Sequence, residues 1–210
     1  MIRKFLVRTA ALGVVALAFT GLGAIATMLS PAPEHEATAE SVTPADSASV
    51  LALMEDELAT TRDELGRAHR ILEFSGRYRI PADLAARVYD HAVDAGLPPA
   101  LGFQLVKIES NFENTAASYA SAVGLTQLRL PTARSYEATL APSDLMNPDV
   151  NLRIGFSYLR DLLDRFDNNL PLALEAYNKG PTLVAAQMAE GIEVRGRYSR
   201  AVMGGMRKGT

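Results

Sequence analysis

Glu109 is the residue whose position in this 210-residue chain most clearly suggests acid–base chemistry. It lies near the end of a predicted helix that Pro98 and Pro99 open. At 100° per residue, Glu109 stands about 60° from the centre of the helix's apolar stripe, so it is expected to be partly buried. Burial raises a carboxyl pKa above its usual value of about 4.3 and keeps the group protonated nearer neutrality, as a general acid requires. The stripe consists of Leu101, Leu105, Ile108 and Phe112.

The spacing of Glu109 does not assign this role by itself, because a glutamate at a helix edge is more often solvated or salt-bridged. Two other segments have compositions suited to a ligand site. Residues 117–127 are small and polar and predict a loop or short hairpin between helices. Tyr177 and Asn178 end an apolar helical turn just before Gly180-Pro181, which interrupts the helix and presents both side chains at its end.

The elements that must position these residues are predicted to be helices. Pro81 opens one with an apolar stripe, and Gly96 is the expected residue just beyond its end. Residues 151–166 predict another, with an apolar side. The predicted fold class is therefore mainly α, with a small loop or hairpin element.

Four blocks of sequence occur in a characteristic order: Lys107-Ile108-Glu109-Ser110-Asn111-Phe112, then Ser118, then Gly124-Leu125-Thr126-Gln127, then Ala176-Tyr177-Asn178-Lys179-Gly180-Pro181. Together they resemble the catalytic domain of the soluble-lytic-transglycosylase (SLT) type, whose members cleave bacterial peptidoglycan. The resemblance covers roughly residues 80–203, and residues 151–159 and Tyr198 also look like the family's pattern. It implies a lysozyme-like (α+β), mainly helical catalytic domain over residues 80–203.

The resemblance implies a role for each matching residue. Glu109 is similar to the family's catalytic acid/base. Ser118 and Gln127 match positions that line the sugar-binding groove. Tyr177 and Asn178 match the family's Tyr-Asn pair, and Tyr177 is expected to hydrogen-bond or orient Glu109 and to contact the sugar.

Several positions depart from the family's pattern, among them Ser121, the shifted Leu130-Pro131, Thr126, Arg129 and Lys179. Thr126 and Arg129 stand where methionines are usual, and Lys179 replaces a common alanine. None of these changes removes the acid or the Tyr-Asn pair, so they are expected to alter substrate fit rather than the chemistry. Arg129 and Lys179 either bind the carboxylates of peptide stems or pair on the solvated rim with local acids such as Glu175.

No second acid near Glu109 is marked by the sequence. Glu113 is expected beyond the helix end, and Glu175 can point away from Tyr177. Glycoside hydrolysis ordinarily uses two carboxyl groups. The resemblance implies lytic cleavage of the MurNAc–GlcNAc β-1,4 bond instead, in which the substrate's own C6 hydroxyl attacks and leaves a 1,6-anhydroMurNAc end. Glu109 then serves first as acid and afterwards as base.

Two other functions remain open from the sequence. One is a hydrolytic muramidase on the same scaffold, and the other is a non-catalytic peptidoglycan-binding or scaffold module. The biological role implied by the resemblance is cell-wall remodelling or envelope-complex assembly.

The N-terminal residues 1–29 are predicted to be a targeting segment. Three cations precede the uncharged stretch from Thr9 to Leu29, which is long enough to cross a bilayer as a helix. An uncleaved inner-membrane anchor and a cleaved signal peptide both fit this pattern. Either one places the functional region in the periplasm, with the N-terminus cytoplasmic.

Residues 30–49 are rich in Pro, Ala, Ser and Glu and predict a disordered linker, although Thr43 and Pro44 suit a helix start. Residues 50–74 then predict an amphipathic helix with a heptad-like seam and an Asp63–Arg67 pair. This helix either packs on its own domain or associates as a coiled coil with a second copy or an envelope partner. The seam consists of Leu51, Met54, Leu58, Thr61, Leu65, Ala68 and Leu72.

The composition excludes several other functions. The chain has no cysteine and three histidines at unrelated spacings, so the sequence offers no thiolate nucleophile and little for a metal site. A net charge of −3 argues against a nucleic-acid-binding protein. We therefore expect no cofactor, no metal and no nucleic-acid partner.

Overall fold

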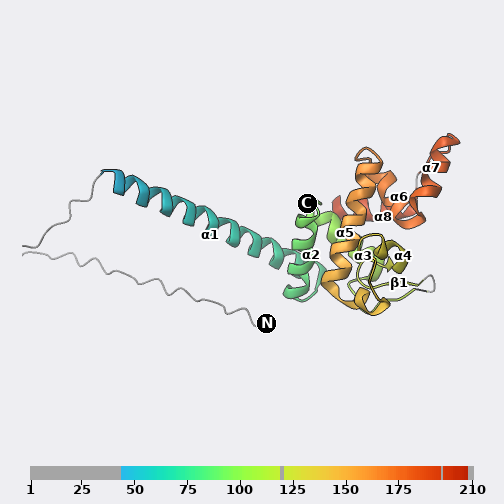
Figure 1. The fold of residues 1–210 in the computed structure, drawn as a ribbon, viewed down its shortest axis with the longest axis horizontal. Helices are drawn as coiled ribbons and strands as arrows, with labels where there is room; N and C mark the ends of the chain where they lie inside the picture. Colours follow the sequence, from blue (N-terminus) through green and yellow to red (C-terminus); the bar gives the residue numbers. More distant parts are fainter. Residues whose placement is uncertain (1–43, 119–120, 195, 208–210) are drawn as a thin grey trace, which may run out of the picture. The chain divides into compact units, whose positions relative to one another are not determined.

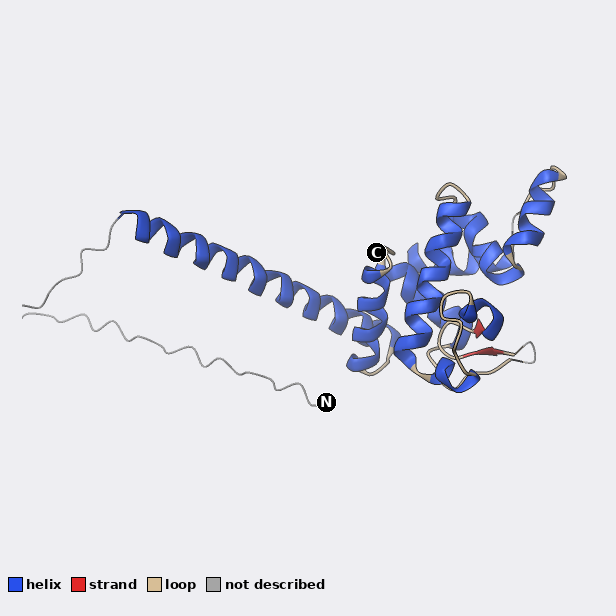
Figure 2. Cartoon of the chain, in the orientation of Figure 1, coloured by secondary structure: helices blue, strands red, loops and turns tan. Residues whose placement is uncertain are grey.

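The computed structural model describes residues 44–118, 121–194 and 196–207, and these residues are mainly helical (Figures 1 and 2). The predicted mainly α class is therefore confirmed. The helices are α1 (Pro44–Tyr78), α2 (Ala82–Asp94), α3 (Pro99–Ser110), α4 (Leu130–Arg134), the 3₁₀ helix η1 (Pro142–Met146), α5 (Pro148–Arg165), α6 (Leu170–Lys179), α7 (Pro181–Ala189) and α8 (Arg197–Arg207). The described strands, β1 (Ala122–Val123) and β2 (Leu128–Arg129), form the short antiparallel hairpin drawn in red in Figure 2.

The helix boundaries follow local sequence signals. Helix α2 begins directly after Pro81, and α3 begins at Pro99, as predicted. Gly96 has a φ of +66°, which a residue with a side chain rarely adopts, and it follows the end of α2 as expected. Asn147 caps α5 by accepting a hydrogen bond of 2.9 Å from the Asp149 backbone N–H.

The hydrophobic core lies among α2, α3, α5, α6 and α8, and α3 is its most buried element. Leu101 and Leu105 are buried as predicted, but Ile108 is exposed and Phe112 lies beyond the helix end. The prediction was therefore wrong at Ile108, whereas Phe112, beyond the helix end, still packs against the core. Phe103 and Val106 are fully buried instead, because neighbouring helices surround the first two turns of α3.

The C-terminal end of α1 belongs to this core. The Phe74 ring stacks on Phe103 with a centroid separation of 4.1 Å, and Tyr78 stacks on the same ring at 5.4 Å. Ile71 is buried beside them. Residues before the predicted domain start at 80 thus contribute aromatic packing to the domain.

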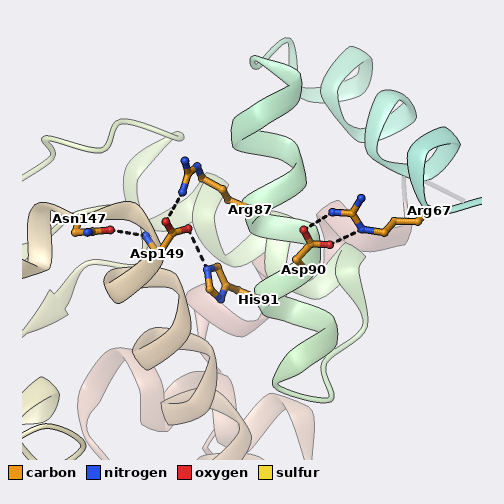
Figure 3. Close-up of polar contacts among 6 residues, drawn as sticks. All are labelled: Arg67, Arg87, Asp90, His91, Asn147 and Asp149. Carbon is orange, nitrogen blue, oxygen red and sulfur yellow. Dashed lines mark hydrogen bonds and ion pairs between the residues drawn. The ribbon is translucent and has the colours of Figure 1, made fainter. Parts of the chain in front are cut away.

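Arg67 attaches α1 to α2 rather than forming the predicted pair with Asp63. Its Nε donates to Asp90 Oδ1 at 2.8 Å, and its second guanidinium nitrogen reaches the other carboxylate oxygen (Figure 3). The bidentate geometry across two helices explains the difference, since a fork of two N–H groups matches a carboxylate.

A second polar cluster attaches α2 to the start of α5 (Figure 3). Asp149 accepts a hydrogen bond from Arg87 through Oδ2, and its Oδ1 lies 3.2 Å from His91 Nε2. The hydrogen bond from Arg87 lowers the pKa of Asp149 against the opposing effect of burial, and the contact with His91 lowers it further. These contacts fix the first turn of α5.

No helix in the described part of the chain is long and apolar enough to span a bilayer. The predicted targeting segment, residues 1–29, lies outside the described residues, as does most of the predicted linker. Helix α1 begins at Pro44, inside the predicted linker, and continues to Tyr78, beyond the predicted end at residue 74.

Candidate active site

The hairpin beside the site is held in place by one buried amide, that of Asn151 on α5. Its Nδ2 donates to the carbonyls of Val123 (2.8 Å) and Leu145 (3.0 Å), and its Oδ1 accepts from the Thr126 N–H at 2.8 Å. Gly124, at the turn, has a φ of +78°, and a Cβ there would clash with the Asn151 amide. The side chain of Asn151 thus fixes the loop between the two strands.

Thr126 faces α5 rather than the cleft. Its side chain is fully buried, and its hydroxyl donates to Asn151 Oδ1 at 2.8 Å. Gly155 provides the space, because a Cβ at that position would overlap the Thr126 side chain. Thr126, which stands where the family usually has methionine, therefore affects the packing of the loop against α5.

A cleft of about 450 Å³ opens between the hairpin, α3, α5 and the end of α6. The structure brings together all five residues predicted for the site, Glu109, Ser118, Gln127, Tyr177 and Asn178, along its lining. The other lining residues are Ala122, Leu128, Arg129, Thr132, Tyr158, Lys179, Gly180 and Pro181.

Glu109 is half-buried on the last turn of α3, with its carboxylate in the cleft. Burial raises its pKa from 4.5 to about 7, although a hydrogen bond from the Tyr198 hydroxyl to Oε1 acts in the opposite direction. The carboxyl group is thus half-protonated near neutral pH. A group in this state is suited to donate a proton and then to take one back.

Tyr198, rather than Tyr177, is the tyrosine that donates a hydrogen bond to Glu109. The Tyr177 hydroxyl donates to the backbone carbonyl of Thr126 at 2.9 Å, so it holds the hairpin loop against α6. Its ring lies 5.2 Å from that of Tyr158, and burial raises the pKa of its hydroxyl well above the usual value. The predicted bond from Tyr177 to Glu109 was wrong, because the carbonyl of Thr126 occupies this hydroxyl.

The sequence marked Tyr198 only as a match to the family's pattern and gave it no role. It stands 89 residues beyond Glu109, on the first turn of α8. Burial raises the pKa of its hydroxyl well above the usual value, so it remains a hydrogen-bond donor across the physiological pH range. Its position in the pattern was the signal that could have identified it.

Ser118 and Gln127 support the hairpin as well as lining the cleft. The Ser118 hydroxyl accepts from the Ala122 N–H at 3.2 Å. The Gln127 side-chain amide donates to the carbonyls of Ala116 and Gly124, each at 3.1 Å. Because its N–H groups are occupied, the amide oxygen of Gln127 is the atom best placed to receive a hydrogen bond from a ligand.

The two unusual cations in the lining differ in their partners. Lys179 forms an ion pair with Glu175, with 2.7 Å between Nζ and Oε2. Arg129 is exposed at the end of β2, and its guanidinium has no hydrogen-bond or ion-pair partner among the described residues. Lys179 thus pairs with a local acid, whereas the charge of Arg129 is open to a ligand.

Glu175 lies behind the cleft. It is fully buried, and its Oε1 accepts from the Ser199 N–H at 2.9 Å. Burial favours the neutral acid, but the contacts with Lys179 and Ser199 outweigh this effect and lower the pKa of Glu175.

The other nearby acid, Glu113, lies beyond the end of α3. Within the described residues, Glu109 is therefore the one carboxylate in the cleft lining.

No cluster of three or more His, Asp or Glu side chains suited to a metal ion occurs in the part of the chain that the structure describes. The chemistry that this arrangement can perform is proton transfer by one carboxyl group, in a groove with hydroxyl and amide groups along its walls.

Comparison with known proteins shows what this domain is similar to. Residues 90–193 match the family model for the transglycosylase SLT domain. The soluble lytic murein transglycosylase of Escherichia coli (strain K12) is 31% identical over 91 residues, which cover 40% of this chain and 14% of the relative. The chain thus matches only a small part of that curated relative's length.

The fold agrees with this match. The crystal structure of the 70 kDa soluble lytic transglycosylase Slt70 from Escherichia coli aligns with 65% of this chain and 25% of its own, with a TM-score of 0.55 and 23% identity. Residues 90–193 of this chain thus match the transglycosylase SLT domain in sequence, and the fold is similar to that of the solved soluble lytic transglycosylase.

Proposed function

We propose that this protein is a peptidoglycan lytic transglycosylase that cleaves the MurNAc–GlcNAc β-1,4 bond. The observation that carries the proposal is that the described residues place a single carboxylate in the cleft lining, that of Glu109, whose pKa lies near 7. One carboxyl group is too few for ordinary glycoside hydrolysis, which uses a pair. It is enough where the substrate supplies its own nucleophile.

In the proposed reaction, protonated Glu109 donates its proton to the glycosidic oxygen as the bond to the anomeric carbon breaks. The substrate's N-acetyl carbonyl stabilises the anomeric centre. The C6 hydroxyl of the same sugar then attacks that carbon, and ionised Glu109 accepts the hydroxyl proton. Glu109 returns to its protonated state, and no water is consumed. Gln127 and Asn178 are proposed to bind the sugar from the groove walls.

The product separates this proposal from its rivals. Purified sacculi are digested with the protein, and the released muropeptides are analysed by mass spectrometry. Lytic cleavage gives 1,6-anhydroMurNAc ends, which lack one water relative to the reducing ends left by a hydrolytic muramidase. Reducing ends would assign hydrolysis, and binding without release would assign a non-catalytic module.

Arg129 is proposed to contact the carboxylates of peptide stems. We expect Arg129→Met to weaken binding of stem-bearing glycan more than binding of stem-less glycan, since the stems carry the negative charge. The difference should be about 0.2–1 kcal/mol and should shrink as salt rises. Titration of both glycans at low and high salt measures this difference in binding free energy.

Arg200→Met is the matched control, because Arg200 is exposed on α8 and outside the cleft lining. Equal losses for both glycans, independent of salt, would assign Arg129 to packing.

A periplasmic location is part of the proposal, since the proposed substrate lies outside the cytoplasm. The charge and length of residues 1–29 support export, either with an inner-membrane anchor or with a cleaved signal peptide. Cell-wall remodelling or envelope-complex assembly is the role that fits such an enzyme.

A further inference from the structure

Helix α1 carries an apolar seam that its own domain does not cover. Leu51, Met54, Leu58 and Leu65 recur at the a and d spacing of a heptad repeat, and their exposed fractions are 58–70%. Only the end of the helix, from Ile71 onward, packs into the core. The sequence allowed the whole helix to pack on its domain, and the structure shows that most of the seam does not.

We propose that α1 is the interface of a parallel, in-register homodimer, in which residues 51–68 pair with the same residues of a second copy. The charges that flank the seam favour this partner. With Leu51 at position a, Glu57 and Glu64 occupy g positions, and Arg62 and His69 occupy the following e positions. In a parallel pair, each g residue faces the next e residue of the partner. Glu57 therefore faces Arg62 of the second copy, and Glu64 faces His69.

The opposite orientation is less complementary, although Glu55 and Arg62, both at e positions, can face each other in it. In an antiparallel pair, g positions face g positions, so Glu57 and Glu64 of one copy would meet the same glutamates of the other. Like charges in such positions destabilise a helical pair. The charge pattern thus selects both the orientation and the register.

These charges have no partner within the described part of one chain. Glu57, Arg62 and Glu64 form no ion pair or side-chain hydrogen bond there. Further along the same helix, Arg67 pairs with Asp90, and Arg77 pairs with Glu73. A second copy would thus supply partners for Glu57, Arg62 and Glu64.

The natural absence of cysteine allows a direct test in the full-length protein in detergent. Thr61→Cys and Met54→Cys, both at d positions, are expected to form disulfide-linked dimers on mild oxidation. Thr60→Cys is the matched control, because it places the same change one residue away, outside the seam. Both d positions cross-link efficiently only in a parallel, in-register pair. Equal cross-linking of Thr60→Cys, or capture of a different protein at Thr61→Cys, would overturn the proposal.

Charge reversal tests the register independently. Glu57→Lys or Arg62→Glu should each weaken the dimer about three- to tenfold in sedimentation equilibrium, and the double variant should recover it. Asp63→Lys, on the outer face, is the control and should leave the association unchanged. A monomer at all concentrations, or a double variant weaker than both single variants, would contradict the pairing. The result does not depend on the catalytic proposal, since it is read from association alone.

Discussion

Glu109→Gln is expected to abolish turnover of peptidoglycan while leaving the protein folded. Glutamine is nearly isosteric but cannot donate a proton to the glycosidic oxygen. General acid–base catalysis typically contributes about 10²–10⁴-fold, and with no second carboxyl group in the described cleft lining the loss should lie at the upper end. Release of soluble muropeptides from sacculi measures it. A variant that retains a tenth of the parent's rate would show that Glu109 is not the acid.

The stability of the same variant is a control for folding. The pKa of Glu109 is raised from 4.5 to about 7 by burial, so the folded state binds the proton more tightly than the unfolded state does. The resulting stabilisation is complete below pH 4.5 and is lost as the pH rises through 7. Glu109→Gln does not ionise, so at pH 8 it should be more stable than the parent, by as much as about 3 kcal/mol. Thermal unfolding at pH 5 and pH 8 measures the difference, and a variant less stable at pH 8 would contradict the burial of this carboxylate.

Much of the site could be predicted from the sequence because its signals are local. Proline and glycine mark the ends of α2, α3 and α6, and the spacing along α3 places Glu109 at the edge of the buried face. The small, polar composition of residues 117–127 indicates the loop and β1, whereas β2 (Leu128–Arg129) lies just beyond that range. These features depend on neighbours within a few residues, which a single sequence records.

The contacts that could not be predicted join residues far apart in the chain. Tyr198 reaches Glu109 across 89 residues, and Arg67 prefers Asp90 on another helix to Asp63 on its own. Asn151 was placed on a helix by its spacing, but nothing local indicates that its amide would hold Thr126 and the hairpin. Helical periodicity indicates which face of a helix is buried, but it does not identify the side chains of other elements that this face will contact.

Glu175→Ala is expected to cause the second largest effect, on both stability and pH dependence. Its buried carboxylate accepts the Ser199 N–H at the start of α8 and pairs with Lys179 on α6. Removing it leaves both groups without this acceptor. Lys179 is partly exposed and can be solvated, but loss of the acceptor of a buried N–H typically costs about 1–3 kcal/mol, which lowers the Tm of a domain of this size by roughly 5 °C.

The pH dependence of activity should also change in Glu175→Ala. Glu175 holds the Ser199 N–H, and Ser199 directly follows Tyr198, the residue that donates to Glu109. The hydrogen bond from Tyr198 lowers the pKa of Glu109, so releasing the start of α8 should raise that pKa. The first step needs protonated Glu109, and kcat/KM is therefore expected to fall above pH 7 in the parent protein. In Glu175→Ala this alkaline limb should move to higher pH, in the same direction as in Tyr198→Phe.

Leu174→Ala separates this positioning role from simple loss of stability. Leu174 is the fully buried neighbour of Glu175 on α6, and its truncation costs about 2–5 kcal/mol without removing the acceptor of the Ser199 N–H. We expect Leu174→Ala to lower the Tm by at least as much and to leave the alkaline limb in place. Glu175→Gln keeps an oxygen for the Ser199 N–H, so it should restore the position of the limb. If the limb stays fixed in Glu175→Ala although the Tm falls, Glu175 stabilises the fold without positioning Tyr198.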